Sequence, residues 1–348
     1  MKIIAALLLA ALFLVSAEGA TNQPPRYRVQ RIEQFVDYDG SAELLLNNRG
    51  QVTALVHDED ATPRLFIRGR KKTEELPLPS GTSGSLNLAG RTTHKTILLR
   101  NPSAYSAYRY HHGKLLNLTN LLPYKYFNMV AMNSRGRIVG GAQREAGPPI
   151  TAFSYYRGRL RELGTGLSDV TTLAFAVNNR GQAVGGAMAR TTLGNATVGT
   201  IRAVLFTKHG GVFLDTRPGA NSSLATGINE RGTVIGRANE LQPVEEEPGN
   251  FRRGFVYRHG SMEPLHPLPG DLRSEPNDIN RRDQIVGRST DENWDTRAVL
   301  FQNGQTYDLN ELIRPERNVE LSDALSINDR GIIVAVGYSG ESFLLIPE

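Results

Sequence analysis

The feature that most constrains the fold of this chain is a ten-residue motif that recurs along most of its length. Its clearest copies read AMNSRGRIVG, AVNNRGQAVG, GINERGTVIG, DINRRDQIVG and SINDRGIIVA. With two weaker copies included, successive copies lie 40 to 51 residues apart. The aligned asparagines are Asn47, Asn87, Asn133, Asn178, Asn229, Asn280 and Asn328. A repeat of this length indicates an array of equivalent structural units.

Each copy of the motif has the chemistry of a tight β-hairpin. The asparagine is followed three residues later by glycine, except in the sixth copy, where Asp283 takes that place. An Asn side chain can accept hydrogen bonds from backbone N–H groups just after it, and glycine readily adopts the left-handed conformation that closes such a turn. Asp also tolerates a positive φ better than most residues do. Apolar residues before the asparagine and β-branched pairs after the glycine predict a strand on each side.

A second hairpin follows in each unit, as in AFSYYRGRLREL and AVLFQNGQTYDL, where an apolar strand runs into a glycine turn and a leucine-ended strand leaves it. Each unit therefore contains about four strands and lacks helical periodicity, which is the size of one propeller blade. Small residues stand two positions before most of the asparagines and seven positions after most of them. We expect these positions to lie where backbones approach closely near a central axis.

These patterns predict an all-β fold, a seven-bladed β-propeller of four-stranded antiparallel blades. Only three strands remain after Asn328, so the N-terminal segment RYRVQRIEQF is predicted to supply the fourth strand of the last blade and to close the ring. The second unit, LNLAGRTTHKT, carries polar residues in place of an apolar strand. Six blades is therefore the alternative count.

The N-terminus has the pattern of a signal peptide. Lys2 precedes an apolar run that is short for a membrane span, and small residues follow at the positions that a signal peptidase recognises. We expect cleavage after Ala17, with Gly19 as the second choice and an uncleaved membrane anchor as the alternative. This predicts a secreted or periplasmic protein whose residues 18–348 form a single propeller domain. The absence of cysteine excludes thiol catalysis and cysteine-ligated metals.

The repeated hairpin resembles the unit of the extracellular HAF repeat family, in which an Asn–Gly hairpin precedes a His-Ala-Phe-like triplet. The resemblance covers roughly residues 40–346 and is carried by segments such as INERGTVIG followed by RGFVYRHGSMEPL. The triplet itself departs from the family pattern, because the chain has TAF, RAV, RGF and RAV at the corresponding places. The chain is therefore similar to a divergent member. The resemblance implies an exported β-repeat protein and supplies no catalytic residues.

Arginine precedes the turn glycine, or its substitute, in six of the units. Because strands reverse at each turn, all these arginines are expected on one face of the propeller, where they would attract a polyanion such as an acidic glycan. The alternative is that they are solvated or pair with a neighbouring blade. Lys and Arg are scattered rather than clustered, and the net charge is only +5, so nucleic acid is not expected as a partner. The residues are Arg49, Arg135, Arg180, Arg231, Arg282 and Arg330.

The opposite face is predicted to carry the longer loops, at residues 189–202 and 238–253, where binding or catalysis is commonly found. Trp294 is expected there either as an exposed platform for a sugar or peptide, or as packing between blades. A glycosidase would instead need two carboxylates about 5 to 10 Å apart. The candidates are Asp58, Glu59, Asp60, Asp271, Glu275, Asp291, Glu292 and Asp295.

No recognisable nucleophile, phosphate or metal-ligand motif is present, so neither a cofactor nor a metal is expected. The leading interpretation is a monomeric, non-catalytic binding or scaffolding module for an extracellular or envelope glycan or protein. The alternative is a secreted glycan-active hydrolase or lyase that uses loop carboxylates. A third interpretation is a structural repeat without a small ligand.

Overall fold

The structure is a computed structural model, and the predicted signal peptide 1–17 lies outside the residues it describes. It describes residues 24–32, 43–57, 62–70, 72–78, 86–93, 96–101, 105–111, 114–143, 149–166, 170–193, 196–214, 222–239, 253–314 and 319–348.

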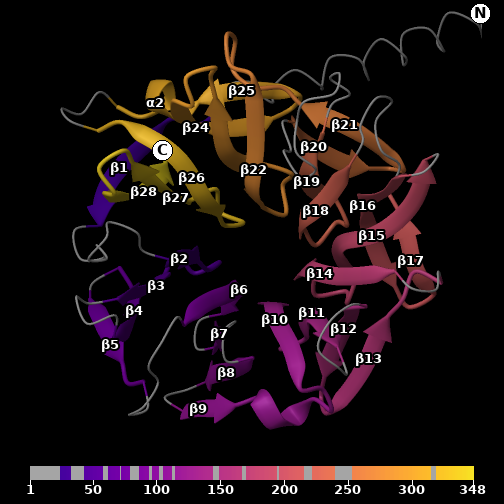
Figure 1. The fold of residues 1–348 in the computed structure, drawn as a ribbon. Helices are drawn as coiled ribbons and strands as arrows, with labels where there is room; N and C mark the ends of the chain where they lie inside the picture. The colour runs from indigo at the N-terminus through magenta and orange to yellow at the C-terminus, as the bar shows by residue number, and fades with distance from the viewer. Residues whose placement is uncertain are drawn as a thin grey trace, which may run out of the picture.

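These residues form seven four-stranded antiparallel sheets arranged as blades around a common axis (Figure 1). The predicted seven-bladed propeller is therefore confirmed, and the six-bladed alternative is wrong because the second unit forms a complete blade. In each of the first six blades the strands follow one another in chain order from the axis outward, so the strand before each asparagine turn is the innermost one.

The first six blades have the following strands. Blade 1 contains β2 (Glu43–Leu46), β3 (Val52–His57), β4 (Pro63–Arg68) and β5 (Thr73–Leu76), and blade 2 contains β6 (Asn87–Thr93), β7 (Thr96–Asn101), β8 (Ser106–His111) and β9 (Lys114–Asn117). Blade 3 contains β10 (Tyr126–Met132), β11 (Ile138–Gln143), β12 (Thr151–Tyr156) and β13 (Arg159–Leu163), and blade 4 contains β14 (Thr171–Val177), β15 (Ala183–Leu193), β16 (Ala196–Thr207) and β17 (Gly210–Phe213). Blade 5 contains β18 (Ser223–Ile228), β19 (Val234–Ala238), β20 (Arg253–Arg258) and β21 (Ser261–Leu265), and blade 6 contains β22 (Arg273–Ile279), β23 (Ile285–Thr290), β24 (Thr296–Gln302) and β25 (Gln305–Asp308).

Blade 7 is built from both ends of the described chain, as predicted. It contains β26 (Leu321–Ile327), β27 (Ile333–Gly337), β28 (Ser342–Pro347) and, outermost, β1 (Tyr27–Ile32). β1 pairs antiparallel with β28 in a register that runs from Tyr27 opposite Pro347 to Ile32 opposite Ser342. Figure 1 shows the first and last strands side by side. This pairing joins the two ends of the ring through backbone hydrogen bonds and removes a free edge.

Helix is almost absent from the described residues. A short 3-10 helix, η1 (Thr119–Leu121), and one α-helical turn, α2 (Leu309–Leu312), lie in the connections between blades. Asp308 caps α2 by accepting a hydrogen bond from the backbone N–H of Asn310. Within the part of the chain that the structure describes, no helix is both long and apolar enough to cross a membrane.

Alternating strand directions give the propeller two distinct faces. The turn face carries the hairpin turns between the first and second strands of each blade and those between the third and fourth strands. The loop face carries the connections between the second and third strands and those that lead from one blade to the next. The apolar core lies between adjacent blades, where large side chains such as Phe153, Phe206, Phe255 and Phe343 are fully buried.

The predicted asparagine turn is present in six blades and is anchored by the Asn side chain. In blade 6, Asn280 Oδ1 accepts hydrogen bonds from the backbone N–H groups of Arg282 (2.9 Å) and Gln284 (3.1 Å). The same pair of bonds recurs at Asn47, Asn133, Asn178, Asn229 and Asn328. The closing residue has positive φ in every case, including Asp283 at 62°.

The buried asparagines also join neighbouring blades, which the sequence did not predict. The side-chain amide of one asparagine donates to the backbone carbonyl of the asparagine in the next blade. This continues without a break from Asn133 to Asn178, Asn229, Asn280 and Asn328, and then to Asn47, at donor–acceptor distances of 2.8 to 3.1 Å. The last of these bonds crosses the closure of the ring. We call this set the asparagine belt.

The prediction for the second blade is wrong in one respect, because Asn87 does not begin a turn. It is the first residue of β6, which pairs with β7 from Asn87 opposite Arg100 to Thr93 opposite Thr96, with a register shift between Ala89 and Thr93. The polar stretch that weakened the motif is therefore part of the innermost strand. The hairpin connection falls about seven residues later than the asparagine alignment implied.

Small residues seven positions after the asparagine are needed within a blade rather than at the axis. In blade 6 the innermost strand has a bulge between Pro276 and Asp278, opposite Gly287. A Cβ at Gly287 would lie 1.9 Å from the backbone oxygen of Glu275. The bulge turns backbone toward the second strand, so a side chain cannot be placed there.

The predicted long loop at residues 189–202 is instead an extension of a hairpin. β15 and β16 remain paired as far as Leu193 opposite Ala196. Most of the second predicted loop, residues 240–252, lies outside the described residues.

Candidate functional site

The turn face carries all six predicted arginines, and all six are exposed. Several of them lie against the next blade. Arg231 forms an ion pair with Asp283 at 3.2 Å, which explains why an acid replaces glycine in that turn. The guanidiniums of Arg282 and Arg330 lie over the turn glycines of the following blades, where an added Cβ would come within 2.8 and 2.5 Å of them.

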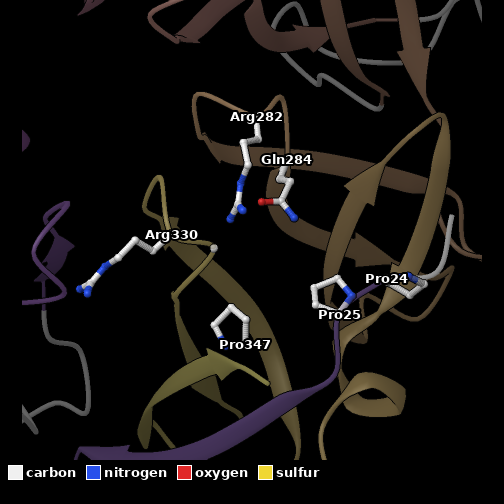
Figure 2. A pocket seen from close by; sticks show the side chains of 7 residues that line it. Pro24, Pro25, Arg282, Gln284, Arg330 and Pro347 are labelled. Atoms are coloured by element: carbon white, nitrogen blue, oxygen red, sulfur yellow. The ribbon is translucent and has the colours of Figure 1, made fainter. Parts of the chain in front are cut away.

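A pocket of about 410 Å³ opens on this face between blades 6 and 7 (Figure 2). It is lined by Pro24, Pro25, Arg282, Gln284, Arg330, Gly331 and Pro347. In Figure 2 the guanidinium of Arg282 lies beside the amide of Gln284, whereas Arg330 extends away from it. The Gln284 amide already bonds to Asn280 and Gln302. Arg282 therefore provides the main positive charge at this pocket.

Trp294 lies on the loop face, so the structure separates it from the predicted arginines. It is in the turn between β23 and β24, which Asp291 holds by accepting hydrogen bonds from the backbone N–H groups of Asn293 (2.8 Å) and Asp295 (2.9 Å). Trp294 has a φ of 70° and is 64% exposed. The guanidinium carbon of Arg273 lies 3.8 Å from the ring centroid, so one ring face holds a cation. Such exposure leaves the other ring face open to solvent.

A second pocket, of about 420 Å³, lies near this turn between blades 6 and 7. It is lined by Arg297, Asp308, Asn310, Val319, Glu320, Leu321 and Tyr338. Tyr338 is 51% exposed, and its hydroxyl donates to the backbone oxygen of Thr296, two residues after Trp294. The two exposed aromatic side chains therefore belong to neighbouring loops. We call the pocket together with Trp294 the aromatic site.

Carboxylates surround the aromatic site. Arg297 pairs with Asp271 at 2.6 Å and lies 3.8 Å from Asp308. The Asp271 side chain is only 2% exposed, and its Oδ2 has no hydrogen-bond partner among the described residues. Burial raises the pKa of the Tyr338 phenol, and the negative charges of Asp295 and Glu320 raise it further. Both carboxylates therefore act electrostatically on this tyrosine.

A second cluster of charges lies on the inner strands of blades 5 to 7, toward the loop face. Arg288 pairs with Glu275 at 2.5 Å and with Asp323 at 3.5 Å, so one guanidinium joins two carboxyls. Glu275 also lies 3.7 Å from Arg237 of blade 5. Asn277, the bulge residue of β22, donates to Asp323 at 2.7 Å. We call these residues the axial cluster.

The carboxyl groups of the axial cluster differ in their surroundings. Burial raises the pKa of Asp323, and the nearby charge of Glu275 acts in the same direction, while Arg288 and Asn277 oppose the shift. Glu275 has two arginine partners. A pair of carboxyls in unlike environments is what acid–base chemistry requires, although ion pairs within a fold produce the same pattern.

The structure accounts for the other predicted carboxylates in different ways. Asp271 is buried against Arg297, and Asp291 holds the Trp294 turn, so both have structural partners. Glu292 and Asp295 are exposed beside Trp294. Asp58, Glu59 and Asp60 lie outside the described residues. Across the described ranges, no group of three or more His, Asp or Glu side chains is placed to hold a metal ion.

Sequence reasoning missed Tyr338, Arg288 and Asp323. Tyr338 has no motif of its own and becomes notable only because its loop lies next to that of Trp294. Asp323 could have been found by comparing repeats, because it stands five residues before Asn328, as Glu275 stands five before Asn280. The same position holds leucine in the fourth and fifth units.

Comparison with known proteins gives one family and a set of similar folds. Residues 168–342 match the family DUF3466, which is described as a protein of unknown function. No curated protein matches the chain. The matched residues extend from blade 4 into blade 7 and include both the aromatic site and the axial cluster.

Among solved structures, a streptogramin B lyase has a similar fold. The similarity covers 93% of this chain and 98% of the lyase chain, with 11% sequence identity and a TM-score of 0.57. YCF48, solved bound to a D1 peptide, is also similar. The similarity covers 95% of this chain and 100% of the YCF48 chain, with 10% sequence identity and a TM-score of 0.52. A third similar structure is the β-propeller domain of the Trilobed protease from Pyrococcus furiosus. The similarity covers 80% of this chain and 82% of that domain, with 10% sequence identity and a TM-score of 0.50. At these identities the likeness concerns the fold alone.

Proposed function

The chain belongs to the DUF3466 family, whose function is unknown, and we propose a function from the surface of this chain. The protein is an exported propeller that binds a glycan at the aromatic site without cleaving it. Export is supported by the signal-peptide pattern of residues 1–17 and by the resemblance of the repeat to the extracellular HAF unit. The expected location is therefore outside the cytoplasm, either secreted or periplasmic.

The observation that carries this proposal is the exposure of Trp294, in a turn that is followed by Thr296, to which the pocket-lining Tyr338 bonds. Large aromatic side chains at a protein surface contribute strongly to binding, because they present a wide apolar face at little entropic cost. The pyranose ring of a sugar has an apolar face of C–H groups that can stack on such a surface. Tyr338 offers a second exposed aromatic surface on the neighbouring loop, on which another sugar of the same chain would stack.

The surroundings of Trp294 favour binding over cleavage. The buried carboxylate of Asp271 is paired with an arginine, and Asp291 holds the Trp294 turn in place. Both acids therefore have structural roles. The site lies between two four-stranded blades that hold its loops in place. Binding a glycan therefore costs little entropy for ordering the protein.

Trp294→Ala is expected to weaken glycan binding at least tenfold, which corresponds to about 1.4 kcal/mol, because it removes the stacking surface. The measurement is retention of the mature protein on a panel of immobilised polysaccharides, followed by titration calorimetry on any ligand found. Leu116→Ala is a matched control, because Leu116 is also an exposed apolar residue but lies on blade 2. Unchanged binding by Trp294→Ala would reject the aromatic site as the binding surface.

The turn-face arginines form the second proposed binding surface, for an acidic glycan. Arg135 and Arg180 are exposed there, which makes them suitable for charge reversal. If Arg135→Glu with Arg180→Glu removes binding and Trp294→Ala does not, the ligand is bound on the turn face. The same panel of polysaccharides distinguishes the two surfaces.

A second candidate function is glycan cleavage by the axial cluster. The observation that favours it is the raised pKa of Asp323, which would suit a general acid, beside Glu275 as a base or nucleophile. If the axial cluster cleaves a glycan, Asp323→Asn and Glu275→Gln should each abolish cleavage. The measurement is the release of reducing or unsaturated ends from a polysaccharide that the unaltered protein cleaves. Absence of cleavage by the unaltered protein across the whole panel would reject this candidate and leave the binding function intact.

A further inference from the structure

We infer that the aromatic site selects glycans whose sugars carry free amino groups. The inference rests on the proposed function and adds the chemical class of the ligand. It is carried by the juxtaposition of an exposed aromatic side chain with exposed carboxylates on the same and the neighbouring loops.

The first argument concerns the Trp294 ring. The guanidinium of Arg273 lies 3.8 Å from the ring centroid, which is a close cation–π contact. The ring quadrupole is negative on both faces, but the positive charge of Arg273 on one side weakens the attraction of the other face for a second cation. The ring therefore supplies a stacking surface for the C–H face of a sugar, and the preference for an ammonium comes from the carboxylates around it.

The second argument concerns the charge around the ring. Glu292 and Asp295 flank Trp294 in the same turn, and both are exposed. Glu320 is exposed on the wall of the pocket. Arg297, the arginine of that wall, is neutralised by Asp271 and Asp308. The described surface therefore presents excess negative charge, which attracts an ammonium and repels an acidic sugar.

The third argument separates an amino glycan from a basic peptide. A lysine side chain would use one aromatic ring at a time and has no broad face to stack. A chain of linked sugar rings can place different rings on Trp294 and Tyr338, and the adjoining pocket of about 420 Å³ has room for a further sugar unit. Stacking and charge attraction then act on the same ligand.

The experiment compares oligomers of β-linked glucosamine with N-acetylglucosamine and glucose oligomers of the same length, using titration calorimetry on the full mature protein. The glucosamine oligomer is expected to bind at least tenfold more tightly than either of the others. The preference should shrink as salt is raised from 50 to 500 mM, because salt screens charges that are exposed. Glu292→Gln with Asp295→Asn should reduce the preference to near equality, and Trp294→Ala should remove binding of all three oligomers.

The outcomes separate this inference from the proposed function. Equal binding of the three oligomers, still dependent on Trp294, would overturn the amino-sugar selectivity while upholding glycan binding. No binding of any oligomer, together with tight binding of polylysine, would overturn both and assign the site to a basic protein. Unchanged thermal unfolding of the Glu292→Gln/Asp295→Asn variant would show that its effect is on the ligand and not on the fold.

Discussion

Replacing Asn280 with alanine is expected to lower the free energy of unfolding by about 4 kcal/mol. Its side chain is fully buried and makes four hydrogen bonds: Oδ1 accepts from the backbone of Arg282 and Gln284, and Nδ2 donates to the Gln284 side chain at 2.8 Å and to the backbone of Asn328 at 3.1 Å. Alanine would leave buried donors and acceptors without partners in two blades. Denaturant unfolding of the two proteins measures the difference.

Two further variants locate the origin of this effect. Arg281→Ala alters the same turn but removes an exposed side chain whose ion pair with Asp329 is long, at 3.9 Å, so it should cost less than about 0.5 kcal/mol. Asn280→Asp keeps an oxygen that accepts the turn bonds, but it places a second oxygen against both the Asn328 carbonyl and the Gln284 side-chain oxygen. An intermediate loss would assign the remainder to the two bonds that Nδ2 donates. A change below about 1 kcal/mol for Asn280→Ala would contradict the stabilising role of the asparagine belt.

Gly287→Ala is the second substitution for which we expect a large effect, a loss of about 3 kcal/mol or more. The new Cβ would lie 1.9 Å from the backbone oxygen of Glu275 and 3.0 Å from Cα of Pro276. Neither atom belongs to a flexible side chain, so the bulge of β22 would have to move. Because Glu275 and Asn277 lie at this bulge, the axial cluster should also be disturbed. Chemical denaturation measures the stability of the variant.

Gly304→Ala provides the comparison for this prediction. Gly304 has a φ of 78°, and a Cβ there would meet no heavy atom within 4 Å, so only backbone strain of about 1 kcal/mol is expected. If the two glycine variants lose equal stability, the loss at Gly287 comes from backbone freedom and not from contact with the bulge.

The local structure of a blade could be read from the chain because its causes are local. Asn280 and Asp283 supply what the turn of blade 6 needs. The side-chain oxygen of Asn280 accepts backbone hydrogen bonds, and Asp283 tolerates the positive φ that reverses the chain. The failure at Asn87 has the same origin. There the asparagine and glycine are present, but the structure places both in the innermost strand, where Asn87 lies opposite Arg100 and Gly90 lies in an irregular stretch between Ala89 and Thr93.

The candidate sites were less accessible to prediction, because each is formed by several blades. Trp294 could be recognised as the only tryptophan of the chain, but its exposure depends on how Arg273 packs beneath it. Tyr338 and Asp323 carry no motif. They acquire a possible role only from Trp294 and Arg288, which belong to a different blade.

By itself, the sequence determined the repeating hairpin, because turn chemistry and strand alternation act over a few residues, and it favoured seven blades closed by the N-terminal strand over the six-bladed alternative. Only the tertiary structure decided that the buried asparagines bond from blade to blade, that the arginines and Trp294 occupy opposite faces, and that carboxylates gather beside exposed aromatic rings. The bonds of the asparagine belt join residues 45 to 281 positions apart in the chain, the longest being between Asn328 and Asn47. The angle and spacing of packed blades, which no single unit encodes, bring them together.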